Sequence, residues 1–252
     1  MVFDGLRTRR PTKLFALAAA IFLVVVLPWL LARAPASTAY AAVGRAYRSS
    51  LEATDREYRV TIDRRGPLGR KHVSTARLFV RGGERFALSH PAPLPGVFWL
   101  GSDGEEHWLV PAVGPVLTSH DRSWLPRWLA KQNASLPYLE ITSILKRLDN
   151  RYALEIAGQE TLEGRREAWQ KVHGTRRQGQ DGPAEIDLWI SPTTGMAGKI
   201  VLTWKEPSAM VGIDRMTFDF VSNRSLPDSW YGHSAHHARA VPAFEVPSRP
   251  GR

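Results

Sequence analysis

The sequence predicts an α+β fold in which a large curved antiparallel sheet, a half-open barrel of about ten or eleven strands, has helices covering its concave face. Three observations predict this fold. Apolar and polar residues alternate with a period of two in many short segments, which is typical of strands with one buried face. Tight turns rich in Gly, Pro and Asp separate these segments. Two stretches with helical spacing interrupt the alternation, and the concave side of a curved sheet is where such helices can bury an apolar face.

The N-terminal region carries an export signal. An unbroken apolar run, Leu14–Ala32, follows three arginines and a lysine at positions 7–13. The run is close to the ~20 residues that cross a bilayer, and basic residues before it hold the N-terminus in the cytoplasm. Residues 39–41 (AYA) also resemble a signal-peptide cleavage site. We therefore expect residues 1–38 to be a cytoplasmic N-terminus followed by a single membrane anchor, with a cleaved signal as the alternative. The rest of the chain is expected in the periplasm.

Composition narrows the classes of function. The chain has no cysteine, so disulfides, a lipoprotein anchor and thiol catalysis are all excluded. Its 34 Lys and Arg against 24 Asp and Glu give a net charge of +10. A positive surplus suits anionic lipid headgroups or acidic partners, although a solvated surface with extra arginines is the simpler explanation. We do not expect nucleic acid as a partner in the periplasm.

The first half of the exported part predicts a helix and then a strand meander. Residues 39–53 are rich in alanine on related helical faces. Alternation of apolar and polar residues begins at Tyr58, and Asp103-Gly104 is a strong signal for a β-hairpin. The strands expected here are 58–63, 73–81, 84–89, 96–100, 107–110 and 113–118.

The second half predicts two short helices, at 124–131 and 138–149, before the strands return. Residues 39–223 are thereby expected to form one domain. Residues 224–252 are expected to be a tail that is mobile from Pro242 onward, with Trp230 and Tyr231 folding back on the domain. The strands expected in this half are 152–156, 168–173, 185–190, 197–204 and 213–221.

Three segments in this order resemble the LolA-like superfamily, which holds periplasmic lipoprotein carriers and RseB-type stress sensors. Residues 102–111 (SDGEEHWLVP) are similar to the family's D-G-x-x-x-W-x-Y-x-P hairpin. Residues 156–165 (IAGQETLEGR) are similar to its G-x-E-x-x-x-G step between strands. Residues 187–196 (DLWISPTTGM) resemble the turn that precedes the next strand, although Gly198 stands about where many members have a proline.

The resemblance implies a non-catalytic function, the binding of a lipid acyl chain or a lipoprotein in an apolar cavity. Burial of an acyl chain contributes ~0.8 kcal/mol per CH₂, so a dry cavity is the physical requirement. An RseB-like regulatory role, through contacts with an envelope protein, is the alternative. The candidate cavity wall, whose members ordinary core packing would explain equally well, consists of Trp99, Trp108, Trp189, Trp204 and Phe218.

A histidine cluster is the second candidate site. His233, His236 and His237 have the spacing that places side chains on one helix face, and imidazoles ligate Zn, Cu or Ni. No acidic residue stands close by apart from Asp228, so a solvated or capping segment is favoured and metal binding is the second alternative function. Motifs for a catalytic nucleophile or a phosphate-binding loop are missing from the sequence, so we expect neither an enzyme nor a cofactor.

Overall fold

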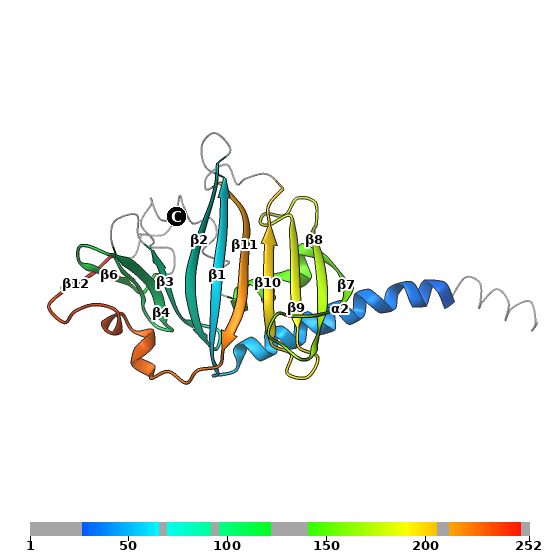
Figure 1. The fold of residues 1–252 in the computed structure, drawn as a ribbon, viewed down its shortest axis with the longest axis horizontal. Coiled ribbons are helices and arrows are strands. Elements are labelled where there is room, and N and C mark those ends of the chain that lie inside the picture. The colour runs from blue at the N-terminus through cyan, green and yellow to red at the C-terminus, as the bar shows by residue number, and fades with distance from the viewer. Residues whose placement is uncertain (1–26, 66–69, 92–95, 122–140, 206–211, 248–252) are drawn as a thin grey trace, which may run out of the picture.

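The computed structural model describes residues 27–65, 70–91, 96–121, 141–205 and 212–247 (Figure 1). The described strands form one 12-stranded sheet in the order β12-β6-β5-β4-β3-β2-β1-β11-β10-β9-β8-β7. Neighbouring strands are antiparallel except for β12, which pairs parallel to β6. The sheet is open, with β12 at one edge and β7 at the other, as the sequence predicts. The strands are β1 (Asp55–Arg65), β2 (Lys71–Arg81), β3 (Arg85–Pro91), β4 (Val97–Asp103), β5 (His107–Val110), β6 (Val116–Ser119), β7 (Tyr152–Thr161), β8 (Ala168–Arg176), β9 (Glu185–Ile190), β10 (Ala197–Thr203), β11 (Ile213–Ser222) and β12 (Ala243–Glu245).

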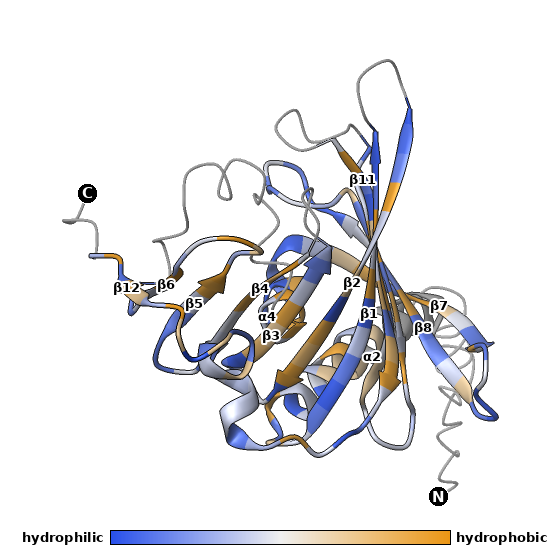
Figure 2. Ribbon diagram, turned by 60° about the vertical axis from the view of Figure 1, so that its left-hand side comes forward, coloured by the Kyte–Doolittle hydropathy of each residue, from blue (hydrophilic) through white to orange (hydrophobic). Residues whose placement is uncertain are grey.

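Two helices lie on the same side of the sheet, which is its concave face (Figures 1 and 2). Helix α2 (Leu27–Leu51) contains most of the helix predicted at 39–53 but begins twelve residues earlier. Helix α4 (Ile141–Arg151) matches the helix predicted at 138–149, whereas the one predicted at 124–131 lies outside the described residues. The helices bury residues at the spacing of a single helical face: Ala39, Ala42, Val43 and Ala46 from α2, and Ile141, Ile144, Leu145 and Leu148 from α4.

The main core fills the space between the helices and the concave face. Alternate residues of β1, such as Tyr58 and Val60, point into it, and so do Ile200 and Leu202 of β10. The residues between them face the convex side. Two smaller clusters lie apart from the main core, one around Trp108 and one around Trp169.

At two glycines, a neighbouring tryptophan ring leaves no room for a side chain. A Cβ on Gly101 would lie 2.2 Å from the ring of Trp108, and one on Gly198 would lie 2.5 Å from the ring of Trp169. Any larger residue at Gly198 would displace that ring.

The C-terminal segment, residues 223–247, runs beneath β3 and β4 in Figure 1 and ends beside β6. It contains two 3₁₀ turns, η4 (Asp228–Tyr231) and η5 (His233–Ala235), and then β12. The expectation that it folds back through Trp230 and Tyr231 is confirmed, since Tyr231 is fully buried. The expectation of mobility from Pro242 onward is wrong for β12, because the N–H of Val246 donates to the carbonyl of Thr118 at 2.7 Å and extends the sheet.

Within the described residues, no helix combines the length and the apolar character needed to cross a membrane. Most of the predicted apolar run, residues 14–26 of Leu14–Ala32, lies outside those residues.

Candidate functional site

An apolar row crosses the concave face from β1 to the β12 edge. Residues that pair directly across neighbouring strands share a face, so the strand register defines the row. From Leu78 on β2 to Phe244 on β12, the row passes from one strand to the next five times. At the usual spacing between neighbouring strands, this distance is about 24 Å. Its members, in spatial order, are Tyr58, Leu78, Leu88, Leu100, Leu109, Leu117 and Phe244.

Exposure rises along this apolar row toward the edge of the sheet. Leu78 is fully buried, Leu117 is half-buried, and Phe244 is 55% exposed. The row therefore begins in the core under the helices and opens at the β6–β12 edge. Five successive leucines across five strands form a continuous apolar surface of the kind that an acyl chain can cover.

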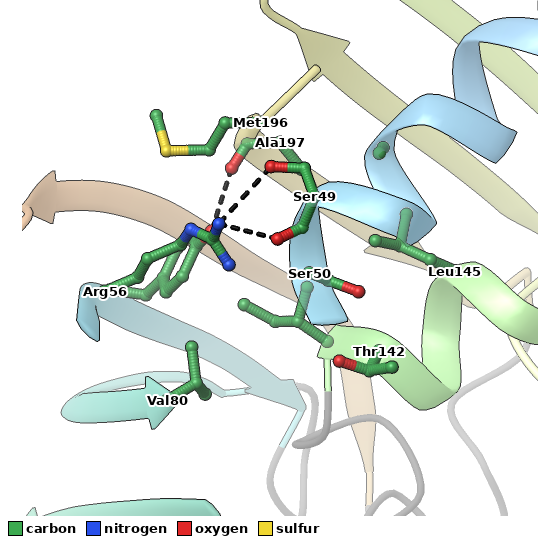
Figure 3. Close-up of a pocket in the computed structure, with 11 residues that line it drawn as sticks. Ser49, Ser50, Arg56, Val80, Thr142, Leu145, Met196 and Ala197 are labelled. Carbon is green, nitrogen blue, oxygen red and sulfur yellow. Dashed lines mark hydrogen bonds between the residues drawn. The ribbon is translucent and has the colours of Figure 1, made fainter. Parts of the chain in front are cut away.

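A small pocket lies at the inner end of the row, between the end of α2, the start of α4 and the strands β1 and β2 (Figure 3). It has room for about one water molecule, roughly 10 Å³. Its walls mix apolar and hydroxyl groups with one charge, and they consist of Ala46, Ser49, Ser50, Arg56, Tyr58, Val80, Ile141, Thr142, Leu145, Met196 and Ala197.

Arg56 is the charged residue of this pocket, and it is only 5% exposed. Its Nη2 donates to the carbonyl of Ser49 at 2.6 Å and to the Ser49 hydroxyl at 3.3 Å. The same nitrogen lies 3.3 Å from a carboxylate oxygen of Glu52, whose side chain is 61% exposed. Within the described residues, the hydrogen bonds of Arg56 to Ser49 and Glu52 all start from Nη2.

Tyr58 completes the polar side of the pocket. Its hydroxyl donates to the carbonyl of Ala197 at 3.0 Å. Burial raises the pKa of Tyr58 to about 12, although the nearby Arg56 charge opposes this shift. Tyr58 is therefore a neutral phenol at physiological pH, and the pocket carries the positive charge of Arg56.

The five predicted cavity residues do not share one face of the sheet. Phe218 and Trp204 belong to the main core on the concave side. Trp99 and Trp108 belong to the cluster beneath the C-terminal segment, and Trp189 packs with Trp169 in the third cluster. Only the first two can line a concave cavity. The physical reason is that period-two alternation defines two faces of a strand without showing which face meets the helices.

A buried polar network fastens the C-terminal segment to the convex face. Asp55 accepts hydrogen bonds from Nε and Nη2 of Arg81 at 2.6 and 2.8 Å, from the Tyr231 hydroxyl at 2.7 Å and from the Leu226 N–H at 2.8 Å. Arg81 also pairs with Asp228. Burial by itself raises the pKa of Asp55, but the hydrogen bonds and the Arg81 charge hold it below its usual value. Burial and the bond to Asp55 raise the pKa of Tyr231.

Aromatic side chains surround His236 next to this network. Its ring stacks on Trp99 with the ring centres 4.0 Å apart, and Trp108 lies nearly parallel at 5.1 Å. Trp230 meets it edge to face, and Nε2 of His236 donates to the carbonyl of Trp230 at 2.7 Å. The indole N–H of Trp108 donates to the carbonyl of Tyr231 at 2.7 Å. The role of His236 in this arrangement is therefore to pack the C-terminal segment.

The other two histidines of the cluster interact with each other. Nδ1 of His233 lies 2.9 Å from Nε2 of His237, and the two rings are stacked with their centres 5.2 Å apart. In the described part of the chain, no group of three or more His, Asp or Glu side chains is arranged to hold a metal ion. The metal-binding alternative is therefore unsupported.

Sequence reasoning did not single out Arg56 or the apolar row. The signal for Arg56 is a run of three charged residues, Asp55 to Glu57, at the start of a strand that is otherwise half apolar. All three are buried, which is uncommon for charged residues unless they have partners or a function. The apolar row depends on the register of seven strands, which no local pattern gives.

No family model matches the chain, and no curated protein matches it in sequence. Similar solved structures include an uncharacterized conserved protein from Thermus thermophilus, with 12% identity, a TM-score of 0.48 and coverage of 83% of this chain and 99% of that one. A LolA superfamily protein from Nitrosomonas europaea has 12% identity, a TM-score of 0.35 and coverage of 77% and 96%. A chain of the Pseudomonas aeruginosa MucA/MucB complex has 13% identity, a TM-score of 0.40 and coverage of 79% and 62%.

The open sheet with two helices on its concave face is the arrangement that the motif resemblance predicts. At identities of 12–13% and TM-scores below 0.5, the similar structures assign no family, ligand or partner to this chain.

Proposed function

We propose that this LolA-like domain binds a lipid acyl chain, free or as part of a lipoprotein, along the apolar row of its concave face, without catalysing a reaction. The observation that carries the proposal is the row itself, in which successive leucines lead from a buried pocket to a half-open edge. Its length of about 24 Å exceeds the roughly 15 Å that the chains of one leaflet occupy in a bilayer. One acyl chain therefore fits along it.

The proposed location is the cell envelope, with the domain on the periplasmic side. The basic residues before Leu14–Ala32 support this orientation, and both an anchor at the cytoplasmic membrane and a cleaved signal are compatible with it. An anchored domain would pass its ligand on at the membrane surface, whereas a released one would carry the ligand away.

A second candidate function is an RseB-like regulatory role through contact with an envelope protein. The observation that favours it is the small size of the described pocket, which has room for about one water molecule and not for an acyl chain. One of the similar structures is itself a protein–protein complex, but that likeness is one of fold and does not assign a partner. In this function the helices would stay closed on the concave face.

The test is direct titration of the full-length protein with cis-parinaric acid, a fatty acid that fluoresces when it leaves water. We expect saturable binding of one molecule per chain. Leu117→Ser, in the half-buried part of the row, should weaken binding about tenfold because it removes apolar contact with the chain. The matched control is Val73→Ser, on the convex face and 67% exposed, which should bind like the unaltered protein. Absence of saturable binding to the folded protein would reject the carrier function and leave the regulatory one.

A further inference from the structure

Arg56 on the concave side and Arg81 on the convex side have different kinds of partner. Arg81, on the convex side, uses Nε, Nη1 and Nη2, with Asp55, Asp228 and the Leu226 carbonyl as partners. Arg56 lines the pocket, and the acidic partner that it has among the described residues is Glu52, whose side chain is 61% exposed. An ion pair with an exposed carboxylate is weak, so an anionic group that reaches the pocket could replace Glu52 at little cost.

The surroundings of Arg56 suit an acceptor with negative charge. Figure 3 shows the guanidinium between Ser49, at the end of α2, and Val80 on β2. Tyr58 in the pocket wall is a neutral phenol, and Glu52, the carboxylate that pairs with Arg56, lies outside the wall. Val80 pairs with Arg56 across the strands, and the neighbouring pair, Tyr58 and Leu78, begins the apolar row. The acyl chain of an amphiphile whose anionic group binds Arg56 would therefore lie at the start of the row.

We propose that Arg56 is the binding site for the anionic head of an amphiphile, a carboxylate or a phosphate, whose acyl chain follows the apolar row. This inference rests on the proposed function and adds the class of ligand to it. The planar fork of an arginine matches the two oxygens of a carboxylate or phosphate, and such charge-assisted hydrogen bonds are strong in a buried site. Because the pocket has room for only about one water molecule, the head must displace the end of α2 or the start of α4, and the same step opens the row to the chain.

The experiment compares three ligands on the unaltered full-length protein. They are a long-chain fatty acid, the fatty alcohol of equal length, and inorganic phosphate, each displacing cis-parinaric acid at low salt. We expect the fatty acid to bind at least about tenfold more tightly than the alcohol, because the alcohol lacks the charge that Arg56 recognises. Phosphate alone should displace the probe weakly or not at all, since most of the affinity comes from the chain. Displacement by phosphate as effective as that by the fatty acid would assign the site to a free anion instead and overturn the proposal.

Two variants sharpen this comparison. Arg56→Gln should reduce the preference for the acid over the alcohol to less than about twofold, and Arg56→Lys should keep part of it. Arg59→Gln is the matched control, because it removes an equal charge from an exposed position on the opposite face of the same strand, and it should leave the preference unchanged.

The outcomes separate the two proposals. If acid and alcohol bind equally well to the unaltered protein, Arg56 is not an anion site, while the carrier function stands. If neither binds, both proposals fail. The comparison on the unaltered protein remains decisive even if Arg56→Gln does not fold, because it needs no variant.

Discussion

The concave face of the sheet is covered by α2 and α4 largely through apolar contacts, and α2 contributes small residues such as Ala39, Ala42 and Ala46. The convex face is covered by the C-terminal segment through a buried ion pair and large aromatic side chains. Apolar contacts have no direction, so another apolar group can replace them at little cost. A buried ionic network is directional, and removal of one partner leaves an uncompensated charge. The contacts of α2 and α4 with the concave face are thus suited to replacement by a ligand. The contacts of the C-terminal segment with the convex face are suited to permanent attachment.

The largest effect expected from this contrast is that of Trp108→Ala. Trp108 is fully buried under the C-terminal segment and donates a hydrogen bond to the Tyr231 carbonyl. Its truncation should lower the free energy of unfolding in urea by about 3–5 kcal/mol. Affinity for cis-parinaric acid should not change at denaturant concentrations where the variant is folded, because Trp108 faces away from the apolar row. A parallel loss of affinity would show that the two faces are coupled and would break the comparison.

The pH dependence of stability should be a smaller effect, and His236 on the convex face should contribute part of it, beside His90, whose pKa burial also lowers. Burial lowers the pKa of His236 from 6.5 and the His237 charge adds to this, although the bond to the Trp230 carbonyl opposes it. Near pH 6.5 the unfolded chain therefore binds a proton at His236, whereas the folded chain binds it only at lower pH. The stabilisation is complete above pH 6.5 and is lost progressively as the pH falls through the lowered pKa of folded His236.

The measurement is urea unfolding between pH 8 and pH 5. His236→Phe keeps an aromatic ring between Trp99 and Trp230 but has no titrating group, so its stability should vary less with pH over this range. His120→Phe, outside the aromatic cluster at an exposed position, is the control and should keep the slope of the unaltered protein. An unchanged slope in His236→Phe would mean that the C-terminal segment does not contribute to the pH dependence.

The sequence predicts most of the fold because apolar and polar residues alternate within each strand, and the apolar residues of α4 recur at helical spacing. β12 could not be predicted, since its three residues are all exposed and its partner, β6, is remote in sequence and parallel to it. The cavity residues illustrate a second limit. Trp108 and Leu109 are both buried on the same strand, and only the tertiary fold shows that Leu109 faces the helices and Trp108 the C-terminal segment. Arg56 carried the weakest signal, because a charged residue at a strand end is normally exposed.

The smallest effect on stability, and the sharpest test of the concave face, is expected at the open end of the apolar row. Phe244→Ser should change the free energy of unfolding by no more than about 0.5 kcal/mol, because Phe244 is 55% exposed. It should nevertheless weaken the binding of a long-chain fatty acid by roughly three- to tenfold, since the lost contact contributes about 1 kcal/mol. A short-chain acid, anchored at Arg56, does not reach Phe244 and should bind as before. Val113→Ser, an exposed apolar position outside the row, is the control for surface hydrophobicity. If Phe244→Ser weakened the binding of short-chain and long-chain acids equally, the acyl chain would lie elsewhere on the domain. The apolar row would then not be the binding site.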